Sequence, residues 1–424
     1  MIQTSLAGII MSSPLHAGPA MNVPDSPSVL STVELAPRDP ILGITDAYNA
    51  DTNPRKVNLG VGVYVDDNGK VPLLECVKQA ERQITERQSP RSYLPIDGLP
   101  AYDREVQRLL FGDGDIVGDG CAITIQALGG TGGLKIGADF LRRFSPHAEV
   151  WISDPSWENH RALFESAGFT VKTYPYYDAA THGLIFHGML VGLADIPAGD
   201  IVVLHACCHN PTGVDPCPEQ WSKVIDAVTS RMLIPFLDIA YQGFAEGIDA
   251  DGAVVRRFAA AGGPLFVSSS FSKSFSLYGE RVGALSVVAS EKLEAARVLS
   301  QMKRVVRTNY SNPPMHGGEI VARVLSTPDL RALWERELAG MRERIRVVRK
   351  QFVEQLMQKA PVADFSFVAQ QRGMFSYSGL NKEMVSRLRD ESSIYAVDSG
   401  RICVAALNSH NLDYVTDAIA HVIA

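Results

Sequence analysis

The stretch Ser268-Ser-Ser-Phe-Ser-Lys273 decides how the rest of the chain is interpreted. It joins two apolar segments, Pro264–Val267 and Ala284–Val288, that have the character of buried strands. A lysine delivered into such a turn loses water around its ammonium, which lowers its pKa towards that of a nucleophilic amine. This amine suits a Schiff base with an aldehyde cofactor, and the serine hydroxyls with Arg281 suit a phosphate. Taken alone, the stretch is more typical of a surface lysine in a serine-rich turn.

Composition places the chain among ordinary soluble globular proteins. It has 424 residues, of which 46% are hydrophobic and 21% are charged, and this length suits two domains. The net charge of −7 argues against nucleic acid as a partner, and no apolar run is long enough to span a membrane. The six cysteines are scattered without a CxxC pair, which indicates reduced thiols and a cytoplasmic location.

The middle of the chain alternates short apolar strands with helical patterns. This order predicts an α/β fold with a mainly parallel, doubly wound sheet, whose ligands bind at the carboxyl ends of the strands. The expected helices between the strands include Leu134–Phe144 and Trp221–Ser230. The expected strands are Ala122–Ile125, Val150–Ser153, Val171–Tyr174, Ile201–Ala206, Ile234–Ile239 and Leu265–Ser269.

The two ends of the chain have a different character. Residues 1–30 are expected to be a flexible arm, and they contain no Lys or Arg, so neither a secretory signal nor a transit peptide fits. Residues Val57–Tyr64 are expected to form a strand, in which Gly60 and Gly62 permit close approach of another group or a bulge. From Thr327-Pro328 one long amphipathic helix is expected to lead into a smaller α+β domain.

Two glycine-rich or aromatic motifs lie at expected strand ends. Gly129-Gly-Thr-Gly-Gly-Leu-Lys135 opens a helix, so its backbone N–H groups and the helix dipole suit an anion, although a tight turn explains it nearly as well. It meets neither the P-loop pattern nor the dinucleotide pattern. In Ser153–His160, Trp157 offers a flat face to a ring and His160 lies near it, but core packing is the commoner explanation of both.

The next strand end carries His205-Ala-Cys-Cys-His-Asn210-Pro-Thr-Gly213. Its two histidines and two cysteines suggest a metal, but adjacent strand residues point to opposite faces and cannot converge on one ion. We therefore expect no metal here. Asn210 precedes a proline and is held extended, which aims its amide at a ligand.

Charged residues at three further places require partners. Asp238 lies in the apolar strand Ile234–Ile239, where a carboxylate needs a cation such as a protonated pyridine nitrogen, and Tyr241 would reach the same ring. A structural salt bridge is the alternative. Arg307 and Arg401 are either ordinary surface arginines or bidentate carboxylate ligands.

Four motifs in order resemble the class I pyridoxal-phosphate aminotransferases, in the branch that contains the aromatic-amino-acid and aspartate enzymes. They are Asn210-Pro-Thr-Gly, Asp238-Ile-Ala-Tyr241, Ser270-Phe-Ser-Lys273 and Leu277-Tyr-Gly-Glu-Arg281. The resemblance covers the chain from about Asp39 to the C-terminus. It implies fold type I, with a seven-stranded, mainly parallel sheet between helices in a large domain (residues 72–340), and a smaller α+β domain formed by residues 31–71 and 341–424.

The resemblance also implies a role for each motif residue. Lys273 would hold pyridoxal 5'-phosphate covalently and then move the substrate proton. Asp238 would keep the ring nitrogen protonated, with His160 behind it, and Tyr241 and Asn210 would bond the ring oxygen.

The other implied contacts belong to the cofactor phosphate, the ring and the substrate. Trp157 would stack on the ring. Two contacts would come from a partner subunit, which makes the active protein a homodimer: Tyr93 at the phosphate and Arg307 at a side-chain carboxylate. The remaining contacts are Gly130, Thr131, Ser270 and Arg281 with the phosphate, Arg401 with the α-carboxylate, and Gly62 against the substrate.

The expected reaction is transfer of an amino group from Tyr or Phe, and also from Asp, to 2-oxoglutarate with ping-pong kinetics. The alternative is a dedicated aspartate aminotransferase, since an aspartate enzyme also needs Arg307. Two rivals are a decarboxylase or β-eliminase with the same cofactor, and a non-enzymatic regulator built on the same scaffold.

Overall fold

The computed structural model describes residues 28–35 and 42–424. Residues 1–39 form one unit and residues 40–424 form a second. In the first unit, residues 28–35 make short turns with exposed side chains. Most of the expected arm lies outside the described residues. The fold itself is contained in the second unit.

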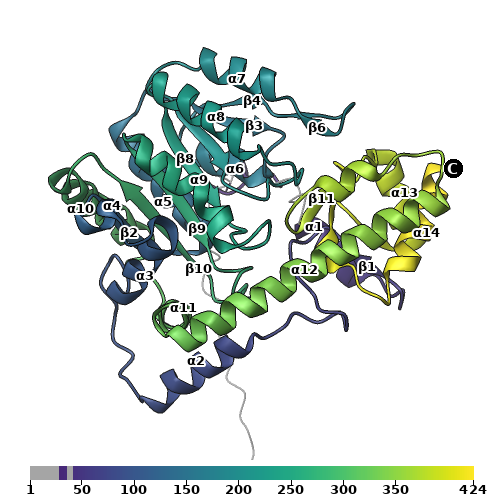
Figure 1. Cartoon of the computed structure of the whole chain (residues 1–424), viewed down its shortest axis with the longest axis horizontal. Coiled ribbons are helices and arrows are strands. Elements are labelled where there is room, and N and C mark those ends of the chain that lie inside the picture. Colours follow the sequence, from purple (N-terminus) through teal and green to yellow (C-terminus); the bar gives the residue numbers. More distant parts are fainter. Residues whose placement is uncertain (1–27, 36–41) are drawn as a thin grey trace, which may run out of the picture. The chain divides into compact units, whose positions relative to one another are not determined.

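A seven-stranded sheet forms the centre of this unit (Figure 1). Strand β10 runs antiparallel to both of its neighbours, and all other neighbours are parallel, which confirms the mainly parallel sheet. In spatial order the strands are β2 (Ala122–Leu128), β10 (Val282–Val288), β9 (Leu265–Ser270), β8 (Ile234–Ile239), β7 (Ile201–His205), β3 (Val150–Asp154) and β4 (Val171–Pro175).

Two apolar cores lie on opposite faces of the sheet, because successive strand residues point to opposite sides. In β8, Phe236 packs into one core and Leu237 into the other. The core around Phe236 is covered by α5 (Gly129–Phe144), α6 (Glu158–Ser166) and α10 (Lys292–Asn309). The other face is covered by α3 (Pro100–Phe111), α7 (Phe186–Asp195), α8 (Pro218–Ser230), α9 (Ile248–Ala261) and α11 (His316–Ser326).

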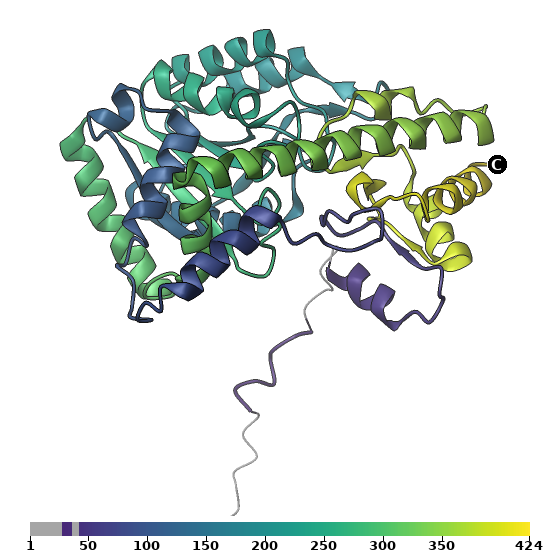
Figure 2. The same ribbon diagram turned by 60° about the horizontal axis from the view of Figure 1, so that its bottom comes forward.

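One long helix, α12 (Pro328–Lys359), connects this layered region to the C-terminal elements, as the sequence predicts (Figures 1 and 2). Near its start it contacts α11 and α2 (Glu75–Glu86), and further along it contacts α14 (Leu412–Ile423). Proline occupies its first position, where the missing N–H costs no hydrogen bond. Trp334, Leu338, Met341 and Ile345 form its buried stripe.

The C-terminal elements form two small sheets, one of them with a strand from the beginning of the chain. Strand β1 (Val57–Asn58) is parallel to β12 (Ile394–Tyr395), and β11 (Phe375–Tyr377) is antiparallel to β13 (Arg401–Cys403). The remaining elements are α1 (Leu42–Ala50), α4 (Asp115–Gly118), β5 (Tyr177–Asp178), β6 (Gly183–Leu184), the 3-10 helices η1 (Ser366–Gln370) and η2 (Val404–Ala406), and α13 (Lys382–Ser392).

The strand expected over Val57–Tyr64 is wrong in length, since β1 ends at Asn58. The side chain of Asn58 accepts the backbone N–H of Gly60 at 3.0 Å, which turns the chain away from the direction of a strand. Residues 59–64 are consequently irregular. In the described part of the chain, no helix is long and apolar enough to cross a membrane.

Candidate active site

The turn that carries Lys273 is fixed between the sheet and α12. It starts where β9 ends, and the N–H of Phe271 donates to the carbonyl of Val282 at 3.0 Å. On the other side, the indole of Trp334 donates to the carbonyl of Ser274 at 2.7 Å. The ring of Phe275 stacks on the same indole with centroids 4.6 Å apart. The lysine is therefore delivered by a turn whose backbone is held on both sides.

The Lys273 ammonium lies in an enclosed and partly cationic environment. Its Nζ is 4.8 Å from the centroid of the Tyr241 ring. Burial lowers the pKa of Lys273 to about 8; nearby Asp238 acts in the opposite direction, while Arg281 and Arg401 lower the pKa further. About a tenth of this amine is thus uncharged at pH 7, far more than for an ordinary lysine, and the uncharged form is the one a nucleophile requires.

Asp238 is held in its ionised form by a buried imidazole. Burial by itself raises the pKa of Asp238, but the hydrogen bond from His160 and the neighbouring positive charges bring it below its usual value. His160 Nε2 lies 2.9 Å from Asp238 Oδ2, and His160 Nδ1 lies 3.0 Å from Ser156 Oγ. Asp238 pairs in register with Ser268 on β9, which places the carboxylate one strand away from the lysine turn.

Two further histidines belong to this cluster and were not given a role from the sequence. His205 pairs in register with Asp238 on the neighbouring strand, and its ring centroid is 4.9 Å from that of His160. Burial is the main reason why the pKa of His205 falls to about 3, so the ring is neutral. His209 lies 4.5 Å beyond it and contacts Ser153 at 2.9 Å. The sequence did contain a signal for this contact, because His205 and Asp238 occupy matching positions at the ends of two predicted strands.

These histidines also bear on the expectation of no metal. The ligand atoms of His160, His205 and Asp238 lie within 4.8 Å of one another. Cys207 and Cys208 are not part of this group. The close pair within it, His160 and Asp238, is already joined by a hydrogen bond, so the cluster acts as a carboxylate–imidazole pair.

Arg401 is a buried cation whose guanidinium is only partly hydrogen-bonded within the chain. It is 1% exposed, and within the described residues it forms no salt bridge. Its Nη1 donates to Asn210 Oδ1 at 3.0 Å and its Nη2 donates to the carbonyl of Gly60 at 2.7 Å, while Nε has no partner. A buried charge without a counter-ion is costly, so this geometry favours a carboxylate ligand.

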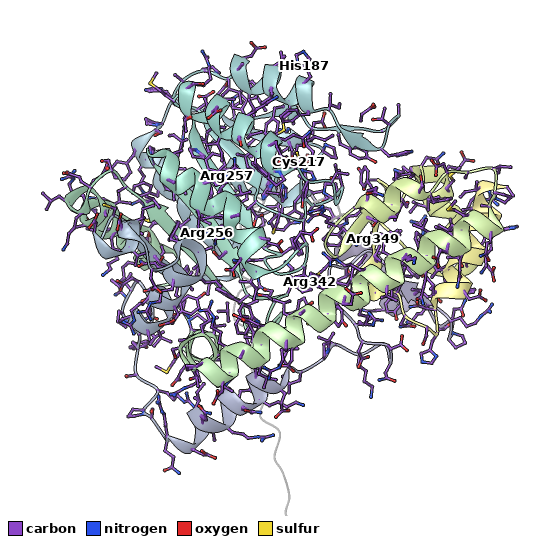
Figure 3. The ribbon with its side chains drawn as sticks, viewed as in Figure 1. His187, Cys217, Arg256, Arg257, Arg342 and Arg349 are labelled. Atoms are coloured by element: carbon purple, nitrogen blue, oxygen red, sulfur yellow. The ribbon has the colours of Figure 1, made fainter. Side chains whose placement is uncertain are left out.

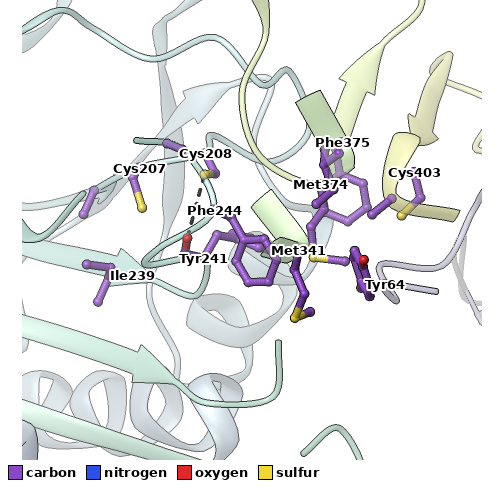
Figure 4. Close-up of a cluster of buried hydrophobic side chains, with 14 of the residues drawn as sticks. Tyr64, Cys207, Cys208, Ile239, Tyr241, Phe244, Met341, Met374, Phe375 and Cys403 are labelled. Carbon is purple, nitrogen blue, oxygen red and sulfur yellow. Dashed lines mark hydrogen bonds between the residues drawn. The ribbon is translucent and has the colours of Figure 1, made fainter. Parts of the chain in front are cut away.

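Two aromatic side chains near Arg401, those of Phe375 and Tyr241, belong to the buried cluster shown in Figure 4. The ring of Phe375 lies 4.3 Å from the Arg401 guanidinium and 5.8 Å from the ring of Tyr241, at a steep angle to it. A Cβ atom at Gly62 would lie 2.6 Å from Phe375 Cζ, so no side chain fits at this position. The close approach of Phe375 explains why glycine occupies position 62, in the segment where the sequence predicted close approach of another group. Phe375 itself was not predicted, because nothing in its local sequence separates it from an ordinary core residue.

An anion cradle forms at the N-terminus of α5. A Cβ atom at Gly129 would lie 2.5 Å from Arg281 Nη2, so the guanidinium packs directly on the helix start. Arg281 Nη1 donates to Ser272 Oγ at 3.4 Å, and Ser270 Oγ donates to the same oxygen at 3.2 Å. Gly130 is buried against Ser270. Hydroxyls, a guanidinium and free helical N–H groups together suit a phosphate.

Four predicted residues lie at the margin of this arrangement or away from it. The ring of Trp157 meets that of His160 edge-on at 5.3 Å, and Thr131 is exposed in the first turn of α5. Tyr93 is 93% exposed, and Arg307 is exposed in the last turn of α10. Arg307 donates to Ser311, and in the described chain neither Arg307 nor Tyr93 has a hydrogen bond to the other predicted site residues.

The fold and this strand-end lysine site define a class of aminotransferases. Residues 54–419 match the model of the family "Aminotransferase class I and II", and the chain belongs to this family. It is 60% identical over 397 residues to an aspartate aminotransferase of Pseudomonas aeruginosa, covering 93% of this chain and all of the relative.

Solved structures of aromatic-amino-acid aminotransferases are similar throughout. The Burkholderia pseudomallei protein, covalently bound to pyridoxal phosphate, has a TM-score of 0.91 and 64% identity, covering 94% of this chain and 100% of that one. The psychrophilic enzyme from Psychrobacter sp. B6, cocrystallised with aspartic acid, has a TM-score of 0.91 and 46% identity, covering 93% and 99%.

Proposed function

We propose that this aminotransferase uses pyridoxal 5'-phosphate to move an amino group from Tyr, Phe and also Asp to 2-oxoglutarate. The observation that carries the proposal is the position of Lys273. Its amine has a lowered pKa and lies near Asp238 and Tyr241, while the chain supplies an anion cradle at Arg281 and an unpaired buried guanidinium at Arg401. These groups match the aldehyde, the ring nitrogen, the phosphate and a substrate carboxylate.

The residues present fit the cofactor. Bound pyridoxal phosphate supplies an electron-accepting ring for bonds at the substrate Cα. The phosphate would be held by Gly130, Thr131, Ser270 and Arg281, and the ring by Trp157, Asp238, Tyr241 and Asn210. The main structural support is that Asp238, although buried, has its pKa below the usual value and so carries the charge that a protonated ring nitrogen needs.

The chain's own groups then bind the substrate and move its proton. Arg401, oriented by Asn210 and the Gly60 carbonyl, takes the α-carboxylate as a bidentate ligand. Lys273 Nζ accepts the proton from the substrate Cα and returns it to the cofactor side, which requires a pKa near the working pH. The packed rings of Phe375 and Tyr241 keep water from this space.

Tyr93 and Arg307 are assigned to the site of a partner subunit. Both are exposed in the single chain, and both have side chains suited to anions. The proposal is therefore a cytoplasmic homodimer in which each site borrows these two residues. Within each chain, residues 31–71 and 341–424 are proposed as the smaller domain and residues 72–340 as the larger.

Substrate range is proposed to be dual because the similar proteins divide between two names. One similar protein is named an aspartate aminotransferase, and an aromatic-amino-acid enzyme was cocrystallised with aspartic acid. A dedicated aspartate aminotransferase remains the second candidate. Measuring kcat/KM for phenylalanine and aspartate separates the two, since a dedicated aspartate enzyme would show negligible turnover of phenylalanine.

The central test is amine transfer by the purified protein. Transfer from aspartate or phenylalanine to 2-oxoglutarate is expected, and Lys273→Ala should abolish it while the variant still binds the cofactor. Lys350→Ala, an exposed lysine on α12, is the matched control and should leave turnover unchanged. Borohydride should fix the cofactor to Lys273 of the wild type, as located by peptide mass. A wild-type protein that transfers neither amine, or a fully active Lys273→Ala variant, would contradict the proposal.

A further inference from the structure

One residue of the lysine turn, Tyr278, touches two parts of the site that are far apart in sequence. It lies between Lys273 and Arg281, and its side chain reaches the irregular segment Leu59–Tyr64. The N–H of Tyr64 donates to Tyr278 Oη at 2.9 Å. Burial raises the pKa of Tyr278, so the hydroxyl stays neutral and available as an acceptor at neutral pH.

The segment Leu59–Tyr64 is anchored to β13 at its start. The N–H of Cys403 donates to the carbonyl of Leu59 at 2.7 Å. The next carbonyl, that of Gly60, accepts from Arg401 Nη2 at 2.7 Å. The segment belongs to no strand, so its position beyond Gly60 depends on isolated contacts such as the bond to Tyr278. Other contacts are the Sγ of Cys403 at the carbonyl of Val63, 3.7 Å away, and the N–H of Val65, which donates to the carbonyl of Ala405 at 3.1 Å, so loss of the bond to Tyr278 would loosen the part of the segment that contains Gly62.

The backbone of Tyr278 faces the other part of the site. Its carbonyl accepts from Arg281 Nη1 at 2.9 Å, and the same nitrogen contacts Ser272 Oγ. A single residue therefore contacts the arginine of the anion cradle through its carbonyl and the segment beside Arg401 through its hydroxyl. The two contacts are separated only by the length of one tyrosine.

We propose that Tyr278 is a positioning residue, which couples the anion cradle to the pocket for the substrate α-carboxylate by holding the segment Leu59–Tyr64 in place. This inference rests on the proposed function, in which Arg281 binds the cofactor phosphate and Arg401 binds the α-carboxylate. Because every amino-acid substrate has an α-carboxylate, Tyr278 affects the affinity for all of them and does not select among them.

The first test is the holoenzyme of the variant Tyr278→Phe, which lacks only the hydroxyl. KM for both aspartate and phenylalanine should rise about fivefold, the effect of one neutral hydrogen bond, while kcat changes by less than about twofold. Tyr414→Phe is the matched control, since its hydroxyl also bonds the backbone, donating to the carbonyl of Ser392 at 2.6 Å, but away from the site. It should leave both KM values unchanged.

The second test measures the contact without using activity. In hydrogen exchange of the wild-type holoenzyme, the Tyr64 amide should be protected although it lies outside any strand, and Tyr278→Phe should speed its exchange about fivefold. Fast exchange of this amide in the wild type overturns the inference, even if the variant does not fold. Unchanged KM values in an active Tyr278→Phe enzyme, or a fall in kcat alone, also overturn it. Absence of amine transfer in the wild type instead contradicts the proposed function.

Discussion

Two buried arginines of this chain show how the same side chain serves two purposes. Arg349, labelled on α12 in Figure 3, is 4% exposed, and its guanidinium donates to the carbonyls of Gly373 and Phe375 and to Ser376 Oγ. Burial lowers its pKa to about 10. Its hydrogen bonds hold the strand that carries Phe375. Arg401 is equally buried but keeps Nε without a partner, which is the difference between a structural cation and one prepared for a ligand.

The lowered pKa of Lys273 predicts that this residue reduces the free energy of unfolding by an amount that depends on pH. Its pKa falls from the usual 10.5 to about 8, so between these values the unfolded chain binds a proton that the folded chain does not, and stability rises with pH. Below pH 8 the full cost, ~2 kcal/mol after allowance for partial exposure, is present. In the cofactor-free protein, Lys273→Met should therefore unfold at higher urea concentration than the wild type near neutral pH.

The pH dependence of the unfolding free energy tests whether the charge of Lys273 is the cause. The difference in unfolding free energy between Lys273→Met and the wild type should shrink as the pH rises from 8 towards 10.5. A difference that stays constant over this interval would show that the lysine's charge is not its source.

At the residue level, the sequence indicates which side chains have reactive groups more readily than it indicates which residues are in contact. Lys273, Asp238 and Arg281 were predicted as site residues because their motifs lie at strand ends, where side chains of different strands converge. The bond from Arg401 to the carbonyl of Gly60 joins residues 341 positions apart, and no local pattern reports such a pair. The same limit applies to Phe375, whose role depends on what the folded chain brings beside it.

At the level of elements, the loop after β8 is held from two sides. Asp251 of α9 accepts the backbone N–H groups of Gly243, Ala245, Glu246 and Gly247. From α12, Arg342 donates to the carbonyl of Gly243 at 2.8 Å and Arg346 donates to that of Ala245 at 2.7 Å. Arg342 is labelled on α12 in Figure 3. This loop begins at Tyr241, so both contacts stabilise the position of a predicted site residue.

Asp251→Asn should therefore lower stability by at least about 2 kcal/mol, because the new amide group places a donor against N–H donors and removes a charged acceptor. Urea unfolding measures this change. Asp249→Asn is the matched control, an exposed acid in the same first turn of α9, and should change stability by less than about 0.5 kcal/mol. Equal effects of the two substitutions would contradict the assigned role of Asp251.

Element types were predictable where the hydrophobic period was regular, as in the sheet strands and α12. The strand expected over Val57–Tyr64 failed because the Asn58 side chain bonds the backbone of Gly60 and ends β1. Apolar residues in this segment reflect burial in an irregular conformation, which a strand pattern does not distinguish. Strand order also was not readable, since β10 pairs not only with β9, the strand before it in the chain, but also with the distant β2.

At the level of the whole molecule, the proposed sharing of sites between two subunits predicts that two inactive chains can restore activity together. Heterodimers of Lys273→Ala and Arg307→Ala chains, separated by two affinity tags, should contain one site with both native residues. Turnover of aspartate should then reach about half that of the wild-type dimer, above either parental homodimer. If each site is complete within one chain, the heterodimer would instead have no more aspartate turnover than the two parental homodimers.

The position of β10 has a consequence for how the protein is made. This strand lies between β2 and β9, yet it follows both of them in the chain. The ribosome has therefore released all the other strands of the sheet before β10, which joins β2 to the rest, emerges. Until then two bare strand edges are open to pairing with other nascent chains, so a stop codon before Val282 should give an aggregating fragment rather than a smaller folded protein.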